Sequence, residues 1–327
     1  MSAGEPPVSR RSGQAPPHRI ASERMSAELI DGRAVAARVR GEVAVAVEEF
    51  VAATGRTPGL ATVLVGEDPA SAIYVANKQK ACLEVGMAAF DRRLPASATA
   101  EEVADELHAL NADETVSGVL LQLPLPDGLD GPELSSLVTP EKDVDGLTPV
   151  NVGLLSLGRP GLRPCTPVGI MELLREAHVE LEGAQAVVVG RSNLIGKPMT
   201  QLLLEANATV TTCHSRTRDL QAVCARAEVL VVAAGRARMI GAGFVAPGAA
   251  VIDVGMHRLT PEEAGNKSGL VGDVDFAAVS EVASAITPVP GGVGPMTVAM
   301  LLRNTLEAAR MQHAHSGASR RAAAPVR

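Results

Sequence analysis

The chain has 327 residues, 46% of them hydrophobic and 20% charged, which suits a globular protein with room for two domains. Its formal net charge of −7 argues against a nucleic-acid-binding surface, which usually needs a basic face. No apolar run reaches the roughly 18 residues of a membrane span. The cysteines (Cys82, Cys165, Cys213 and Cys224) show no CxxC or zinc-ligand spacing. These features predict a cytoplasmic protein with reduced cysteines and no metal, membrane or nucleic-acid partner.

The N-terminal third predicts alternating helices and strands. Residues 1–24 contain Pro, Arg, Ser and Gly but no apolar signal core, so we expect a disordered leader, and Met25 is a candidate start. Helical spacing follows over residues 30–51. The segments that follow are a strand at 60–65, a helix from Pro69 to about 85, a strand at 88–94, a helix at 101–110 and a strand at 118–122. This β-α-β-α-β order predicts a parallel sheet covered by helices.

The rest of the chain predicts a second α/β unit. Residues 123–167 are rich in Pro, Gly and Asp, as in an active-site and hinge region, and we expect short helical pieces there. A linking helix is expected over 167–177. Further strands are expected at 186–189, 209–213, 229–233, 250–254 and 285–286. A last helix over 295–311 should pack back on the first domain, before a disordered tail at 313–327. The predicted domains are 25–148 with 295–312, and a Rossmann-like domain at 149–294, with a cleft between them.

A glycine loop follows the first strand of the second unit. Gly190 permits a tight turn, and Gly196 opens a helix whose N-terminal amides can face a pyrophosphate. Ser192 stands where the usual second glycine would be, so a purely structural turn is an alternative interpretation. Its place after a strand, at the start of a doubly wound unit, favours a dinucleotide site.

The next strand indicates which dinucleotide. NAD-binding enzymes usually carry an acidic residue at its end, whereas this chain has His214, Ser215 and Arg216. Together with Arg191, Ser215 and Arg216 suit a ribose 2′-phosphate, which favours NADP over NAD. The alternative is that these are solvated charges at a strand end.

Ser71, Tyr74 and Lys78 share one face of a helix in the first domain, at spacings i, i+3 and i+7. Such spacing also occurs in ordinary amphipathic helices. It matches the Tyr-x-x-x-Lys pair of short-chain dehydrogenases as well, but there the pair follows the dinucleotide loop within one domain. Here it precedes that loop by more than a hundred residues, which disfavours that interpretation.

Polar and glycine-rich segments complete the candidate site. Gln122 closes a buried strand, where it is either a structural hydrogen bonder or a site residue, since ligands bind at the carboxyl ends of parallel strands. Asp143 and Asp145 lie in a tight turn, without the further ligands that a metal site needs. The Gly- and Pro-rich loop at 287–297 joins the second domain to the last helix, so we expect it at the cleft.

Together these segments resemble the bifunctional methylenetetrahydrofolate dehydrogenase/cyclohydrolase family. The resemblance spans residues 26–312, and each motif is weak alone, but all of them in order are highly specific. It rests on Tyr74–Lys78, Gln122–Pro126, Lys142–Gly146, Arg163–Pro167, the Gly190 loop and Pro288–Thr297.

The resemblance implies a function and a set of site residues. It implies oxidation of 5,10-methylenetetrahydrofolate with NADP, hydrolysis of the methenyl product to 10-formyltetrahydrofolate, and a homodimer. The implied catalytic residue is Lys78, supported by Tyr74, Gln122 and Asp145. The expected substrate-binding residues are Tyr74, Lys78, Gln122, Asp145, Pro290, Gly291 and Gly292. The expected NADP-binding residues are Gly190, Arg191, Ser192, Gly196, Ser215, Arg216 and Met256.

Two other functions stay open on the residues alone. One is an NADP reductase of short-chain type that uses Tyr74 as its acid, which activity on carbonyl substrates without folate would support. The other is an NADP-sensing protein without catalysis, against which the intact Lys78, Gln122 and Asp145 argue.

Overall fold

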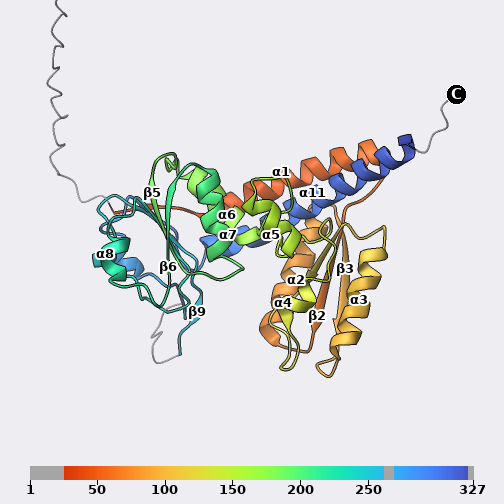
Figure 1. Cartoon of the computed structure of the whole chain (residues 1–327), viewed down its shortest axis with the longest axis horizontal. Helices are drawn as coiled ribbons and strands as arrows, with labels where there is room; N and C mark the ends of the chain where they lie inside the picture. Colours follow the sequence, from red (N-terminus) through yellow and green to blue (C-terminus); the bar gives the residue numbers. More distant parts are fainter. Residues whose placement is uncertain (1–25, 261–268, 323–327) are drawn as a thin grey trace, which may run out of the picture.

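A computed structural model describes residues 26–260 and 269–322 (Figure 1). The predicted leader, at 1–24, and the last five residues of the predicted tail lie outside these ranges. The chain forms two α/β bodies, each built around its own parallel sheet, and two long helices lie side by side along the smaller body (Figure 1). No helix in the described ranges is both long and apolar enough to cross a membrane.

The smaller sheet confirms the prediction for the first domain. Its strands β2 (Gly59–Val65), β3 (Ala88–Leu94) and β4 (Gly118–Leu121) are parallel, in the order β3-β2-β4. Helices α2 (Pro69–Glu84) and α3 (Ala100–Ala112) connect them. Helix α2 begins where expected, because the Asp68 carboxylate accepts a hydrogen bond from the Ser71 amide at 2.7 Å and Pro69 needs no amide partner.

The larger sheet is Rossmann-like and has six strands. The five predicted strands are present as β5 (Gln185–Val189), β6 (Thr209–Cys213), β7 (Val229–Val232), β8 (Ala250–Asp253) and β11 (Ala285–Ile286). The sheet order is β1-β11-β8-β7-β5-β6, and every neighbouring pair is parallel. Helices α7 (Gly196–Glu205) and α8 (Leu220–Cys224) follow the first two strands of this unit.

The short helical pieces predicted within 123–167 are present as α4 (Gly131–Ser135) and α5 (Pro149–Ser156). The other short elements were not predicted: the 3₁₀ helix η1 (Ala242–Phe244), α10 (Phe276–Val279), and the antiparallel pair β9 (His257–Arg258) and β10 (Leu270–Val271). The edge strand β1 (Glu28–Leu29) pairs with β11 of the larger sheet, although the sequence placed residues 25–31 in the first domain. A two-residue strand is too short for a periodic pattern, so its partner is set by tertiary pairing.

The last helix returns to the first domain, as predicted. Helix α11 (Val293–Ala322) packs against α1 (Gly32–Thr54) and α6 (Cys165–Glu176), and the three share one hydrophobic core (Figure 1). The prediction of a disordered tail is wrong over residues 313–322, which continue the helix. Gln312 donates hydrogen bonds to the carbonyls of Ser117 and Glu141, at 2.8 and 3.0 Å. A helix anchored there extends at low cost, because nucleation is the costly step.

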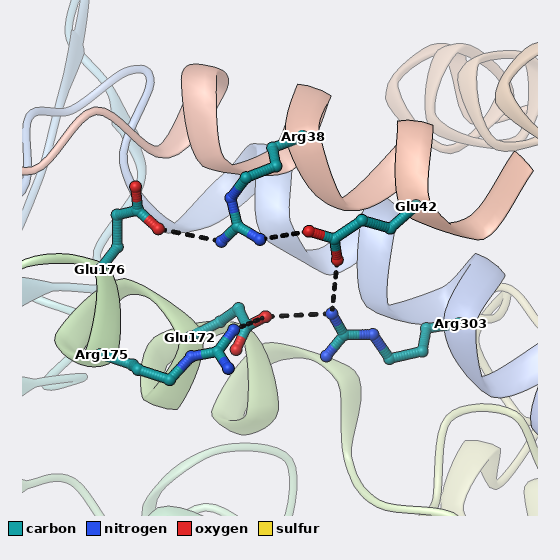
Figure 2. A network of polar contacts seen from close by, with 6 residues as sticks. All are labelled: Arg38, Glu42, Glu172, Arg175, Glu176 and Arg303. Carbon is teal, nitrogen blue, oxygen red and sulfur yellow. Dashed lines mark hydrogen bonds and ion pairs between the residues drawn. The ribbon is translucent and has the colours of Figure 1, made fainter. Parts of the chain in front are cut away.

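An ion-pair network ties these three helices together (Figure 2). It comprises Arg38 and Glu42 of α1, Glu172, Arg175 and Glu176 of α6, and Arg303 of α11. At its centre the buried Glu172 carboxylate accepts hydrogen bonds from Arg175 at 2.6 Å and from Arg303 at 3.0 Å. The network therefore fixes the linking helix α6 against the two helices that cover the first domain.

Candidate active site

Helix α2 carries Tyr74 and Lys78 to the carboxyl edge of the smaller sheet. Tyr74 is 43% exposed, and Lys78 is half-buried. Ser71, on the same predicted face, is buried, and its amide serves the start of the helix. Tyr74 and Lys78 are therefore the residues of this helical face that stay accessible to a ligand.

Lys78 and Gln122 are joined as the sequence suggested. The Lys78 ammonium Nζ lies 2.9 Å from Gln122 Oε1, just beyond the end of β4. Gln122 in turn donates from Nε2 to the Leu123 carbonyl at 2.6 Å. That second bond fixes which end of the amide faces the lysine. Gln122 therefore orients the Lys78 amine through this hydrogen bond.

The two carboxylates of the Lys142–Gly146 turn have different roles. Asp143 is buried, and its carboxylate accepts from the Thr148 amide at 2.8 Å and the Asn151 side chain at 2.9 Å, so it shapes the turn. Asp143 also forms a parallel bridge with Val119 of β4. This pairing places Asp145, two residues later, beside the carboxyl end of β4, where it interacts with Lys78.

Lys78, Asp145 and Cys165 form one electrostatic cluster. Burial lowers the pKa of Lys78, against the opposing effect of Asp145 and Cys165. Burial also raises the pKa of Asp145, while Lys78 opposes that rise and Asp143 adds to it. The site thus combines an amine that loses its proton more easily than an ordinary lysine with a carboxylate in a poorly solvated position.

Cys165 is a site neighbour that the sequence did not assign. Its predicted burial is confirmed, at 3% exposure, and burial raises the pKa of its thiol well above the usual value. The thiol lies 3.2 Å from the Val144 carbonyl, and it acts to lower the pKa of Asp145. Asn304 of α11 donates to the carbonyls of Val144 and Arg163, both at 2.8 Å. The last helix therefore holds the two segments that carry Asp145 and Cys165.

The second domain reaches this site through Met256. Its sulfur lies 3.7 Å from the Tyr74 hydroxyl, across the cleft between the two sheets. Met256 is 52% exposed and follows β8. Met256, which is predicted for the cofactor site, thus contacts Tyr74, which is predicted for the folate site.

The Pro290–Gly292 loop lies where the chain leaves the larger sheet for α11. A Cβ at Gly32, the first residue of α1, would lie 1.8 Å from the Gly292 carbonyl oxygen. Gly291 has a positive φ of 110°, which favours glycine. Close backbone packing therefore requires glycine at position 32, and the backbone conformation favours glycine at position 291. Contact of the Pro290–Gly292 loop with substrate stays a prediction.

The Gly190 loop has the shape of a dinucleotide site. Gly190 has a φ of 139°, and a Cβ there would lie 2.3 Å from the Ala233 carbonyl oxygen. The Ser192 hydroxyl accepts hydrogen bonds from the amides of Ile195 and Gly196, at 3.1 and 3.4 Å. Ser192 therefore holds the turn that leads into α7, where a pyrophosphate is expected.

Three polar side chains follow the adjacent strands β5 and β6, where the ribose is expected. Arg191 follows β5, Ser215 and Arg216 follow β6, and all three are exposed. No acidic residue occupies positions 214–216, so nothing there repels a phosphate. Two guanidinium groups and a hydroxyl at the ends of adjacent strands fit the 2′-phosphate of NADP.

Comparisons with known proteins agree with this geometry. The tetrahydrofolate dehydrogenase/cyclohydrolase catalytic domain matches residues 30–145, and the NAD(P)-binding domain of the same name matches residues 164–313. Bifunctional protein FolD 2 of Frankia alni is 64% identical over 88% of this chain and 97% of its own length.

Solved structures extend the match to the fold. The FolD dehydrogenase/cyclohydrolase of Campylobacter jejuni superposes with a TM-score of 0.83 at 43% identity, covering 88% of this chain and 100% of that one. The Trypanosoma brucei FolD enzyme, solved with NADP cofactor and inhibitor, gives a TM-score of 0.83 at 40% identity, covering 88% and 99%. The chain therefore belongs to the tetrahydrofolate dehydrogenase/cyclohydrolase family.

Proposed function

We propose that Lys78 serves both steps of this bifunctional enzyme. The enzyme oxidises 5,10-methylenetetrahydrofolate to the 5,10-methenyl form with NADP, and then hydrolyses that product to 10-formyltetrahydrofolate. The observation that carries the proposal is the Lys78–Gln122 hydrogen bond at 2.9 Å, in a setting that lowers the pKa of the lysine.

In the oxidation step, Lys78 acts best as a neutral amine. Loss of hydride from the methylene carbon leaves a delocalised amidinium cation. A protonated Lys78 beside that carbon would repel it, and the lowered pKa of Lys78 reduces this repulsion. The Gly190 loop, Arg191, Ser215 and Arg216 would hold NADP, which would supply the hydride acceptor when bound.

In the hydrolysis step, the same amine moves a proton. Water adds to the methenyl carbon, and the C–N bond to one ring nitrogen then breaks. Neutral Lys78 can accept one proton of the attacking water and deliver it to the departing nitrogen, while Gln122 holds the amine in place. The second proton of that water leaves the hydroxyl as the carbonyl forms and passes to solvent, so the cation and water give the neutral formyl product and H⁺ without a further reactant.

Folate binding falls to Asp145 and Tyr74 in this proposal. The Asp145 carboxylate can accept two parallel hydrogen bonds from the pterin amine and ring nitrogen. Tyr74 is the only tyrosine of the chain, and its exposed ring offers a flat face for the pterin. The Pro290–Gly292 loop borders the same cleft from the second domain.

The test follows both reactions in one cuvette. Purified protein is incubated with 5,10-methylenetetrahydrofolate and NADP, and methenyl absorbance should first rise and then decay to the 10-formyl product. Absence of folate turnover, with reduction of carbonyl substrates by NADPH instead, would favour a short-chain-type reductase that uses Tyr74 as its acid.

We further propose that the enzyme is a cytoplasmic homodimer. Strand β6 is an open edge of the larger sheet, since β5 is its only partner within residues 26–260 and 269–322, and Leu204 of the adjacent α7 is 58% exposed. The four cysteines are free and buried, as expected in a reducing compartment. Light scattering should give twice the mass of one chain, and Leu204→Lys should reduce it.

A further inference from the structure

A second polar cluster lies at the carboxyl edge of the larger sheet. The Asp273 carboxylate is fully buried, with Oδ2 accepting from the amides of Ala234 and Gly235, at 2.6 and 2.9 Å. Oδ1 accepts from the Arg236 amide at 2.8 Å and lies 2.6 Å from His257 Nε2. These amides form the loop that follows β7, where open parallel sheets bind their ligands.

Asp253, at the end of β8, holds the backbone of Asp273 in place. Its carboxylate accepts from the Asp273 amide at 2.9 Å and the Val274 amide at 3.0 Å. A Cβ at Gly272 would lie 1.8 Å from Asp253 Oδ2, so the two segments are in direct contact. The backbone around Asp273 is therefore held in place. Its carboxylate can in turn fix the positions of His257 and of the 234–236 loop, to which it is hydrogen-bonded.

His257 links this rigid centre to the cleft. It is the immediate neighbour of Met256, whose sulfur contacts the Tyr74 hydroxyl of the first domain at 3.7 Å. The imidazole is partly exposed, and its bond to Asp273 joins β9 to the segment after β10. A continuous path thus runs from the 234–236 loop, through Asp273 and His257, to Met256 and Tyr74.

We propose that His257 and Asp273 are positioning residues for the oxidation step. Their hydrogen bond holds Met256 against Tyr74 and, through the same carboxylate, holds the 234–236 loop at the cofactor edge. The pair therefore sets the alignment between the nicotinamide, carried by the second domain, and the folate carbon, carried by the first. This inference rests on the proposed function and assigns it two residues that touch neither reactant.

The two activities should respond differently to loss of the pair. Oxidation needs both domains in register, and a displacement of about 1 Å can cost up to about 100-fold in rate. Hydrolysis uses Lys78, Gln122 and Asp145, which all lie on the first domain. A purely structural pair would instead lower both activities together with stability.

The experiment compares His257→Leu with His257→Gln. Glutamine can place a donor near the position of Nε2, whereas leucine removes it. His257→Leu should lower the dehydrogenase kcat about tenfold and weaken NADPH binding, followed by NADPH fluorescence, while the cyclohydrolase kcat stays within about twofold. His257→Gln should recover most of the dehydrogenase kcat. Met256→Ala should reproduce the kcat loss from the other end of the path.

Three results would overturn the inference. They are equal loss of both activities in His257→Leu together with a lower free energy of unfolding, no change in either activity, or a glutamine variant that behaves like the leucine variant. If His257→Leu does not fold, His257→Ala, which also removes the donor to Asp273, decides by the same ratio of activities. Failure of the proposed function is seen separately, as a wild-type protein that binds NADPH but turns over no folate.

Discussion

Lys78 is placed between two partners that act on it in opposite ways. Gln122 accepts its hydrogen bond without adding charge, whereas Asp145 favours the protonated form. Burial outweighs Asp145, so the net pKa of Lys78 is lowered. One amine can then serve as a neutral neighbour in oxidation and as a proton carrier in hydrolysis.

Replacement of Lys78 should separate the two activities. Proton transfer is typically worth about 10²–10⁴-fold, so Lys78→Met should nearly abolish cyclohydrolase activity. Oxidation depends mainly on alignment, so some dehydrogenase activity should remain and methenyl product should accumulate. Lys78→Arg should not restore hydrolysis, because a guanidinium keeps its proton in this pH range. Paired assays of both steps, with NADPH binding as the folding control, decide. Near wild-type hydrolysis in Lys78→Met would refute the assignment.

Asp145 should control both folate affinity and the pH dependence of oxidation. Asp145→Asn mispairs the pterin donors, at about 1–3 kcal/mol, so the folate KM should rise while NADP affinity is retained. The substitution also removes the main group that raises the pKa of Lys78. The pKa of Lys78 should fall further, and the rising limb of dehydrogenase kcat against pH, measured at saturating folate, should move to lower pH. A limb that stays in place or moves to higher pH would contradict this account.

Arg191 and Arg216 should decide between NADP and NAD. A charge-assisted phosphate contact is worth about 1.5–3 kcal/mol, so Arg191→Ala and Arg216→Ala should each raise the NADP KM about tenfold or more. Turnover should change less, and the KM for NAD should stay nearly constant. Arg226→Ala, an exposed cation at the amino end of β7, is the control. Equal or better wild-type kcat/KM with NAD would refute the preference.

At the scale of elements, sequence patterns predicted the strands whose limits are marked by neighbouring residues in the chain. The strands at 88–94, 209–213 and 285–286 have the predicted bounds, because turn-forming residues on either side mark where they begin and end. Strand β1 and the β9–β10 pair escaped prediction because no turn-bounded apolar run marks them in the sequence, and they form only through pairing with their partner strands. Cys165 and His257 escaped for the same reason, since Asp145 and Asp273 are brought to them only by folding.

The packing of α1, α6 and α11 should depend on Glu172. Its buried carboxylate accepts hydrogen bonds from both Arg175 and Arg303. Glu172→Gln removes the negative charge between these two guanidinium groups and leaves a neutral amide in its place. We expect a loss of about 1–3 kcal/mol in the free energy of unfolding, measured in urea. The matched control is Glu307→Gln, which breaks an exposed pair with Arg310 on the same helix and should cost less than about 0.5 kcal/mol. Equal effects would show that the network does not fix α6.

In the whole molecule, the chain passes three times between the two sheets. It leaves the larger sheet after β1, returns to it through α6, and leaves again after β11 into α11. The cleft is bordered by the residues that follow β4 on one side and by those that follow β8 and β11 on the other. Helix α11 therefore matters beyond its own domain, because Asn304 holds the segments that carry Asp145 and Cys165.

The length of α11 that the fold requires can be measured by shortening the chain. A protein spanning residues 26–315 keeps the hydrogen bonds from Gln312 to Ser117 and Glu141 and the edge contact, with centroids 6.1 Å apart, between the rings of His313 and Phe50. It should retain both activities and the melting temperature of the full chain. A protein that ends at Met311 loses these contacts, at about 1–3 kcal/mol, and its melting temperature should fall by several degrees.

The comparison separates the helix from its extension. Both shortened proteins lack residues 1–25 and the end of α11, so only residues 312–315 distinguish them. A marked loss of stability or activity already in the 26–315 protein would show that a removed segment binds the body or a second copy of the chain. Equal stability of the two would show that the Gln312 bonds add nothing, and that α11 is held by its apolar face alone. We expect the loss to appear between residues 315 and 311, because there the helix still contacts the carbonyls at the amino end of β4 and beside Lys142.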